Sequence, residues 1–99
     1  MLLVALALAA GAAGCGESRA PVPSTAVGVI TAIEGEGSGV TSFTLETDDD
    51  GTFEVFIAAD VDYGFDLAHL HEHETTGDPV RCRLEERDGR AYALEIVDA

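Results

Sequence analysis

The sequence predicts a mainly β fold, an OB-like five-stranded small barrel that follows a signal peptide and a tether. Three observations predict it. Short runs of residues alternate between apolar and polar, glycine-containing turns separate these runs, and one helical stretch stands between the third and fourth runs. The order strand-strand-strand-helix-strand-strand is that of the OB-fold, a partly open Greek-key barrel. Its helix is expected to cover one end.

The first fifteen residues, MLLVALALAAGAAGC, are apolar or small. This run has the length of a signal-peptide core and is too short to span a membrane. Its end, Ala12-Ala13-Gly14-Cys15, resembles the lipobox of bacterial lipoproteins. The resemblance implies that residues 1–14 are removed, that Cys15 is lipidated, and that the protein is anchored to the cell membrane on its extracytoplasmic side. A plain secretory signal and an intact membrane helix are the alternatives.

Residues 15–26 contain small and polar residues with two prolines, which is typical of a semi-extended tether. Residues 27–99 then form the predicted barrel domain. Its length of about 73 residues is near the lower limit at which one hydrophobic core suffices. If Cys15 is lipidated, Cys82 has no partner for an intramolecular disulfide. Cys82 stands in the same apolar series as Val80 and Leu84, with an arginine on either side of it. We therefore expect a buried apolar side chain rather than a reactive thiol.

The first three predicted strands follow one another through short turns. Val27–Glu34 is rich in β-branched residues, and Val40–Thr47 and Thr52–Ala58 alternate between apolar and polar. Asp50-Gly51 between the second and third strands is a strong hairpin signal. The side chains expected to face the interior from these two strands are Phe43, Leu45, Phe53, Val55 and Ile57.

The stretch from Gly64 to Pro79 predicts a short helix of about ten residues. Asp66 is the expected N-cap, because its carboxylate can accept hydrogen bonds from free backbone N–H groups of the first turn. Gly77 can adopt the left-handed conformation of a C-terminal cap, and Pro79 prevents continuation.

The predicted helix is amphipathic. Leu67 and Leu70 form an apolar stripe that is expected to cap the barrel, and His69, Glu72 and His73 lie toward the other side. So short a helix needs packing against the barrel to be stable.

The last two predicted strands are Val80–Glu86 and Arg90–Val97, with Asp88-Gly89 as a second hairpin turn. In the first of them every second residue is apolar. The residues expected to face inward are Val80, Cys82 and Leu84 from one strand, and Tyr92, Leu94 and Ile96 from the other.

The domain also resembles a group of small exported bacterial proteins of unknown function that carry OB-like domains behind a signal peptide or lipobox. The resemblance covers about three quarters of the chain. It is carried by the strand order and by the segments VTSFTLETDDDG, FDLAHLHEH and GDPVRCRLEERDGRAYALEI. It implies the fold and the compartment, and it carries over no site residues.

The chain is strongly acidic, with nineteen Asp and Glu residues against five arginines and a formal net charge of −14. Such a surface repels the phosphates of nucleic acids and of anionic lipids. We therefore expect no nucleic-acid partner. The charge favours a cation or a basic protein or peptide, and the alternative is that it serves solubility alone.

The motif HLHEH supplies candidate metal ligands. Residues four apart share a helix face, so His69 and His73 can present two imidazoles to one Zn²⁺, while His71 points away. A carboxylate from Asp60, Asp62 or Glu72 is expected to complete a weak surface site. The pattern is not the HExxH motif of metalloproteases, because Thr75 stands where a histidine is required. The alternative is a solvated helix face with one histidine packed at the barrel edge.

Two acidic clusters are candidates for Ca²⁺. ETDDDG at residues 46–51 resembles the start of an EF-hand loop, but Ile57 stands where that loop needs a bidentate ligand. DVDYGFD at residues 60–66 is expected in an irregular loop that can curl around a hard cation. Ordinary turn chemistry is the alternative for both. Apart from these Zn²⁺ and Ca²⁺ candidates, no cofactor is expected.

OB-folds usually bind ligands on the outer face of their second and third strands. Here Thr44, Glu54 and Phe56 represent that face, which has one aromatic residue and no arginine among the residues of those two strands. Binding of single-stranded nucleic acid needs several aromatic residues on a basic groove, so this face predicts another kind of ligand.

Catalytic signatures are lacking: no serine stands in a nucleophile-elbow pattern, and no cofactor motif is present. We therefore expect a non-enzymatic, lipid-anchored binding or envelope-associated module. A metal-handling protein that uses His69 and His73 is the alternative. The sequence leaves the ligand and the oligomeric state open.

Overall fold

The structure is a computed structural model of the chain, and it describes residues 22–99. The predicted signal peptide, the lipobox and Cys15 lie outside the described residues. Within residues 22–99, no helix has the length and apolar character needed to cross a membrane.

The described residues form a closed five-stranded barrel with one α-helix. The strands are neighbours in the order β2-β3-β4-β6-β5, and β2 closes the barrel by pairing with β5. All neighbouring pairs are antiparallel except β4 and β6, which are parallel. The elements are β2 (Thr25–Glu34), β3 (Ser42–Thr47), β4 (Thr52–Ile57), α2 (His69–Thr76), β5 (Val80–Arg87) and β6 (Arg90–Asp98). The predicted OB-like barrel and its strand order are confirmed.

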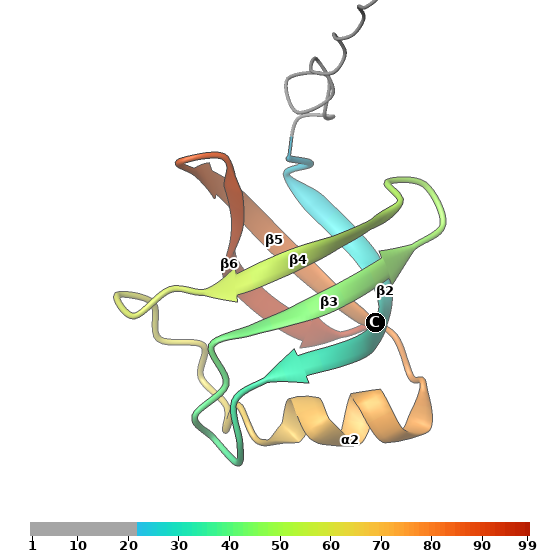
Figure 1. The fold of residues 1–99 in the computed structure, drawn as a ribbon, viewed down its shortest axis with the longest axis vertical. Coiled ribbons are helices and arrows are strands. Elements are labelled where there is room, and N and C mark those ends of the chain that lie inside the picture. The colour runs from blue at the N-terminus through green and yellow to red at the C-terminus, as the bar shows by residue number, and fades with distance from the viewer. Residues whose placement is uncertain (1–21) are drawn as a thin grey trace, which may run out of the picture.

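The two ends of the barrel differ (Figure 1). Helix α2 lies across one end, and the β3–β4 and β5–β6 hairpins extend at the other. We call these the helix end and the mouth. The first described residues also lie at the mouth.

Strand β2 closes the barrel because it pairs with two neighbours. Gly28 marks the overlap, since it pairs with Thr47 of β3 and with Val80 of β5. A side chain at this position would collide with the backbone of Glu46, so only glycine permits the close approach. Because β2 begins at Thr25, the last residues of the expected tether belong to the barrel.

The core consists of the inward-facing side chains of the alternating strands. The predicted inward residues of β3 and β5, together with Val55 of β4, are buried. Cys82 is one of them, and burial raises the pKa of its thiol to about 12. The prediction of a buried cysteine is therefore confirmed.

Strand β6 departs from the predicted alternation. Ile96 is buried as expected, but Tyr92 and Leu94 do not share its face, and the buried residues before it are Ala91 and Ala93. A register shift against β5 leaves Leu94 as an extra residue, which is the geometry of a β-bulge. Since side chains alternate along a strand, one extra residue reverses the faces on either side of it.

Helix α2 begins at His69, later than predicted, and Asp66 is not its N-cap. The carboxylate of Asp66 accepts the N–H of Ala68 at 3.0 Å, and its carbonyl accepts the N–H of His69 at 2.9 Å. Asp66 therefore caps a tight turn that precedes the α-helix. Bonds between residues three apart are typical of such turns at helix ends.

The other end of α2 agrees with the prediction. Gly77 has φ 79° and donates its N–H to the carbonyl of His73 at 2.9 Å. Leu70 is fully buried and Leu67 packs against the core, so both cap the barrel. The placement of His73 on the solvent side was wrong, because this residue is only 5% exposed. It follows Leu70 by three residues and thus lies on the same helix face.

Candidate functional sites

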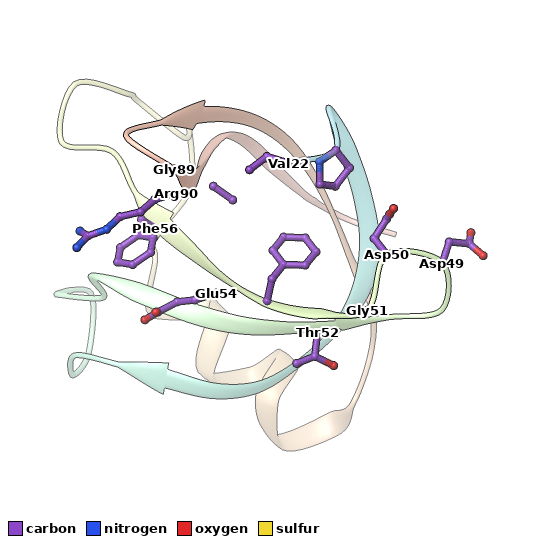
Figure 2. A pocket seen from close by; sticks show the side chains of 12 residues that line it. Val22, Asp49, Asp50, Gly51, Thr52, Glu54, Phe56, Gly89 and Arg90 are labelled. Atoms are coloured by element: carbon purple, nitrogen blue, oxygen red, sulfur yellow. The ribbon is translucent and has the colours of Figure 1, made fainter. Parts of the chain in front are cut away.

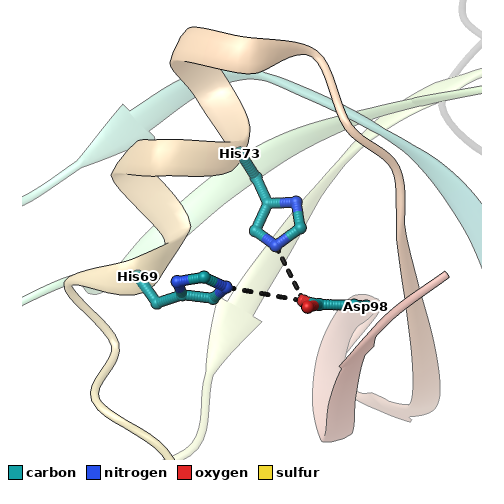
Figure 3. A group of neighbouring side chains, drawn as sticks. All are labelled: His69, His73 and Asp98. Atoms are coloured by element: carbon teal, nitrogen blue, oxygen red, sulfur yellow. Dashed lines mark hydrogen bonds and ion pairs between the residues drawn. The ribbon is translucent and has the colours of Figure 1, made fainter.

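At the helix end, two histidines and an aspartate converge (Figure 3). His73 Nε2 lies 2.8 Å from Asp98 Oδ1, and His69 Nε2 lies 3.5 Å from the same oxygen. The two imidazole rings are 4.8 Å apart at an interplanar angle of 89°. We call His69, His73 and Asp98 the histidine cluster.

The second nitrogen of each ring also has a partner. His73 Nδ1 lies 2.9 Å from the carbonyl oxygen of Asp78, which can only accept a hydrogen bond, so Nδ1 carries a proton. His69 Nδ1 lies 3.0 Å from a carboxylate oxygen of Glu72. Both rings are therefore held by their Nδ1 atoms, with Nε2 directed at Asp98.

The ionisation of His73 and Asp98 follows from these contacts. Burial lowers the pKa of His73, but its hydrogen bonds to the Asp78 carbonyl and the Asp98 carboxylate outweigh burial, so the pKa lies above the ordinary value of 6.5. The hydrogen bond from His73 lowers the pKa of Asp98 below 3.8. The pair is thus an imidazolium and a carboxylate in mildly acidic solution.

Of the three carboxylates expected beside the histidines, Glu72 contacts His69, whereas Asp60 and Asp62 lie outside the cluster. Asp98 takes the expected place of the third ligand. The carboxylate of Asp62 accepts the backbone N–H of Gly64 at 3.0 Å. In the same loop, Asp60 forms an ion pair with Arg87 at 3.1 Å. These carboxylates serve turn geometry and loop anchoring, and they do not converge on one point.

At the mouth, the barrel opens into a groove with a volume of about 560 Å³. One wall comes from the β3–β4 hairpin and β4, and the others come from the first described residues and the β5–β6 hairpin (Figure 2). We call it the mouth groove. Its lining residues are Val22, Pro23, Asp49, Asp50, Gly51, Thr52, Phe53, Glu54, Phe56, Gly89, Arg90 and Ala91.

Strand β4 borders this groove with an edge that is only partly paired. Its pairing with β6 covers Val55 to Ile57, so within the described residues Thr52–Glu54 have a strand neighbour on the β3 side alone. Across the groove, the segment that begins at Val22 is tied to β5 by a hydrogen bond from the Leu84 N–H to the Ser24 carbonyl at 2.8 Å.

Charged side chains lie at both rims of the groove, and Glu54, two residues before Phe56 on the same face of β4, adds a carboxylate on the Arg90 side (Figure 2). Asp49 and Asp50 lie on one rim, are exposed, and form no ion pair within residues 22–99. Arg90 and Phe56 lie on the opposite rim, where the guanidinium is 4.9 Å from the ring centre. Arg90 likewise has no carboxylate partner in the described part of the chain.

The description of this face as having one aromatic residue and no arginine was incomplete. The bulge in β6 turns Tyr92 outward, where its ring lies 5.6 Å from that of Phe56. Arg87 lies 5.3 Å from the Tyr92 ring centre, but Asp60 and Glu85 neutralise its charge. One reason for excluding nucleic acid is thereby weakened, and the argument from net charge remains.

Two of the three residues expected on the ligand face line the mouth groove. Glu54 and Phe56 line the mouth groove, and Thr44 pairs with Glu54 from β3 without lining it. Glu54 accepts a hydrogen bond from the hydroxyl of Ser42 at 2.7 Å, which orients its carboxylate.

Two residues of these sites, Asp98 and Arg90, were not predicted from the sequence. Asp98 is 25 residues from His73 in the chain, and the pairing of β5 with β6 alone brings it to the helix. Arg90 was treated only as a strand start, although the predicted order of strands places the fifth strand beside the third in an OB-fold. That adjacency was the available signal for Arg90.

No family model matches this chain, and no curated protein or solved structure is similar enough to match it.

Proposed function

We propose that this protein is a non-catalytic binding module that holds an extended, basic peptide segment of a partner protein at the membrane surface. The mouth groove is the observation that carries the proposal. It combines an apolar floor, three carboxylates without ion-pair partners among the described residues, and a strand edge that is open in the same part of the chain.

The partly paired edge of β4 favours an extended ligand. A peptide that lies along Thr52–Glu54 can hydrogen-bond to the strand backbone, which is a common mode of peptide recognition. Phe53 and Phe56 offer apolar surface for its side chains. The backbone contacts would supply affinity, and the side-chain contacts would supply specificity.

The charges favour a basic ligand. Asp49 and Asp50 on one rim are suited to a lysine or arginine side chain, and the net charge of −14 attracts such a partner from a distance. Arg90 on the other rim is suited to a carboxylate, so it would fix the direction in which the peptide lies.

The predicted anchor limits where the partner can be. Cys15 and Val22 are seven residues apart, and a fully extended chain of that length spans at most about 25 Å. Since Val22 lines the groove, a lipid on Cys15 would keep the groove near the membrane surface. A groove held there would favour a partner segment that is itself close to the membrane.

The binding proposal can be tested by NMR titration of residues 16–99, a chain without Cys15 that contains every core residue of the described part. Three decapeptides are compared, in which valine alternates with lysine, glutamate or serine. We expect the lysine peptide alone to shift the amide signals of Thr52–Glu54. Shifts confined to other surfaces, or equal shifts with the glutamate peptide, would contradict the proposal.

A charge-matched pair of variants separates groove binding from general attraction. Asp49→Asn with Asp50→Asn removes two charges from the groove, and Glu36→Gln with Glu74→Gln removes two exposed charges elsewhere. We expect the first pair to weaken lysine-peptide binding about tenfold or more, and the second to have little effect. A single-stranded DNA decamer serves as a further control, and binding of it at Phe56 and Tyr92 would overturn the exclusion of nucleic acid.

The anchor is tested separately in the full chain. Cys15→Ala is expected to release the protein from the membrane fraction of bacteria that express it, because the acyl chains attach through that sulfur. A variant that remains in the membrane fraction would contradict the lipid anchor without affecting the groove.

A further inference from the structure

We propose that the histidine cluster at the helix end is a binding site for one Zn²⁺ ion, with His69 Nε2, His73 Nε2 and the carboxylate of Asp98 as its ligands. One candidate ligand atom from each residue lies within 4.8 Å of the others. This site is at the opposite end of the barrel from the mouth groove, and it does not depend on the proposed peptide binding.

The ligand atoms already point at one place. Both Nε2 atoms face the same oxygen of Asp98, at 2.8 and 3.5 Å, and the rings stand at 89° to each other (Figure 3). Zn²⁺ takes nitrogen ligands at about 2.0–2.1 Å in a tetrahedron, an arrangement that brings its ligand atoms within a few ångströms of one another. Small side-chain movements would therefore suffice to admit the ion.

The orientation of the rings is fixed as it is in known zinc sites. A zinc-binding histidine almost always donates its other N–H to a carbonyl or carboxylate oxygen. His73 has the Asp78 carbonyl at 2.9 Å for this purpose, and His69 has Glu72 at 3.0 Å. These contacts hold each ring through its Nδ1 atom and leave Nε2 directed at Asp98, where the ion would bind.

The backbone that carries the ligands is also well anchored. His69 and His73 are one turn apart on α2, whose last turn is closed by the bond from Gly77 to the His73 carbonyl. Asp98 pairs with Val80, and the next residue, Ala99, donates its N–H to the Pro79 carbonyl at 3.1 Å. The ion would therefore bind between two elements that are already in place.

The donor set selects the kind of ion. Two imidazole nitrogens and one carboxylate suit Zn²⁺ and Cu²⁺, whereas Ca²⁺ and Mg²⁺ prefer oxygen ligands throughout. The side chains of His69 and Asp98 are 41% and 70% exposed. A fourth coordination position would thus be open to water or to a group from another molecule.

The site is tested with residues 16–99 after removal of bound metal with a chelator. Calorimetric titration with Zn²⁺ should show one ion per chain, and Co²⁺ should give the intense visible absorption of tetrahedral coordination. Mg²⁺ and Ca²⁺ should give no signal, and Cu²⁺ should compete with Zn²⁺. No saturable binding of Zn²⁺ would overturn the proposal.

The variants avoid His73, because replacing a buried residue can unfold the protein. His69→Ala and Asp98→Asn are expected to weaken Zn²⁺ binding at least tenfold and to remove the Co²⁺ absorption. His71→Ala is the matched control, since His71 Nε2 lies 3.2 Å from the Gly37 carbonyl and belongs to no cluster with the other two histidines. Equal losses in His71→Ala and His69→Ala would overturn the assignment.

A second pair tests the orienting role of Glu72. Glu72→Gln is expected to weaken binding by roughly tenfold, the lower end of the range for contacts that orient metal ligands. Glu74→Gln, on an exposed position of the same helix, should leave the affinity unchanged. If the two variants behave alike, Glu72 does not orient His69.

Discussion

The two ends of the barrel use the same kinds of residues in opposite ways. At the helix end, α2 covers the interior with Leu70, and the acidic Asp98 is paired with His73. At the mouth, Phe53 is only partly buried, and Asp49 and Asp50 have no ion-pair partners within the described residues. The helix end therefore buries its groups in the core, whereas the mouth leaves charged groups exposed to solvent.

The largest loss of stability is expected when the buried side chain of Leu70 is removed from the helix end. Leu70 has no exposed surface, so Leu70→Ala leaves a cavity and is expected to cost about 2–5 kcal/mol in the free energy of unfolding. Urea denaturation of residues 16–99 measures this loss. Phe56→Ala at the mouth, where the ring is half-buried, is expected to cost at most about half as much. A larger loss for Phe56→Ala would reverse the comparison between the ends.

The thiol of Cys82 reports on opening of the barrel between the two ends. Because this thiol is buried and its pKa is raised to about 12, it should not react with Ellman's reagent at pH 8 until the barrel opens. Leu70→Ala is expected to speed the reaction more than tenfold, and Phe56→Ala to speed it less. In residues 16–99 Cys82 is the only thiol. Rapid labelling of the unmodified chain would contradict a closed barrel.

The His73–Asp98 pair should make the stability of the metal-free protein depend on pH. Since the pKa of His73 is raised, its contribution is complete below 6.5 and is lost as pH rises through the folded-state pKa. Since the pKa of Asp98 is lowered, its contribution is complete above 3.8 and is lost as pH falls through its folded-state pKa. The pair therefore stabilises most between these values. In EDTA, the urea midpoint should fall as pH rises from about 5.5 to 9.

A variant without the titrating group isolates this effect. His73→Gln can still donate a hydrogen bond but carries no proton that is lost in this range. We expect its urea midpoint to be lower at acidic pH and to change less with rising pH. If the midpoint of His73→Gln falls as steeply as that of the parent, another group is responsible.

The smallest effect on stability is expected at the mouth. Asp49→Asn with Asp50→Asn changes exposed side chains without ion-pair partners among residues 22–99, so the free energy of unfolding should change by less than about 0.5 kcal/mol. The same substitutions should weaken binding of the lysine peptide. A marked loss of stability would show that these carboxylates at the mouth contribute to folding. The two ends of the barrel would then differ less in their contribution to the free energy of unfolding.

Much of the fold was predictable because its signals are local. Alternation placed Phe43 and Leu45 inside, and Asp88-Gly89 predicted the second hairpin, where both residues have positive φ. Gly77 predicted the end of α2 for a similar reason, since left-handed backbone geometry favours glycine. The start of α2 was less predictable, because Asp66 can cap a tight turn as readily as an α-helix.

The order of the elements along the chain, the turns, the C-terminus of the helix and the pair of histidines four residues apart were predictable, because each depends on neighbours along the chain. The bulge in β6, the outward position of Tyr92 and the position of Asp98 beside His73 depend instead on contacts between strands. The physical reason is the same for all three. Pairing β6 with β5 on one side and β4 on the other sets its register, and no local pattern in β6 records where its partners lie.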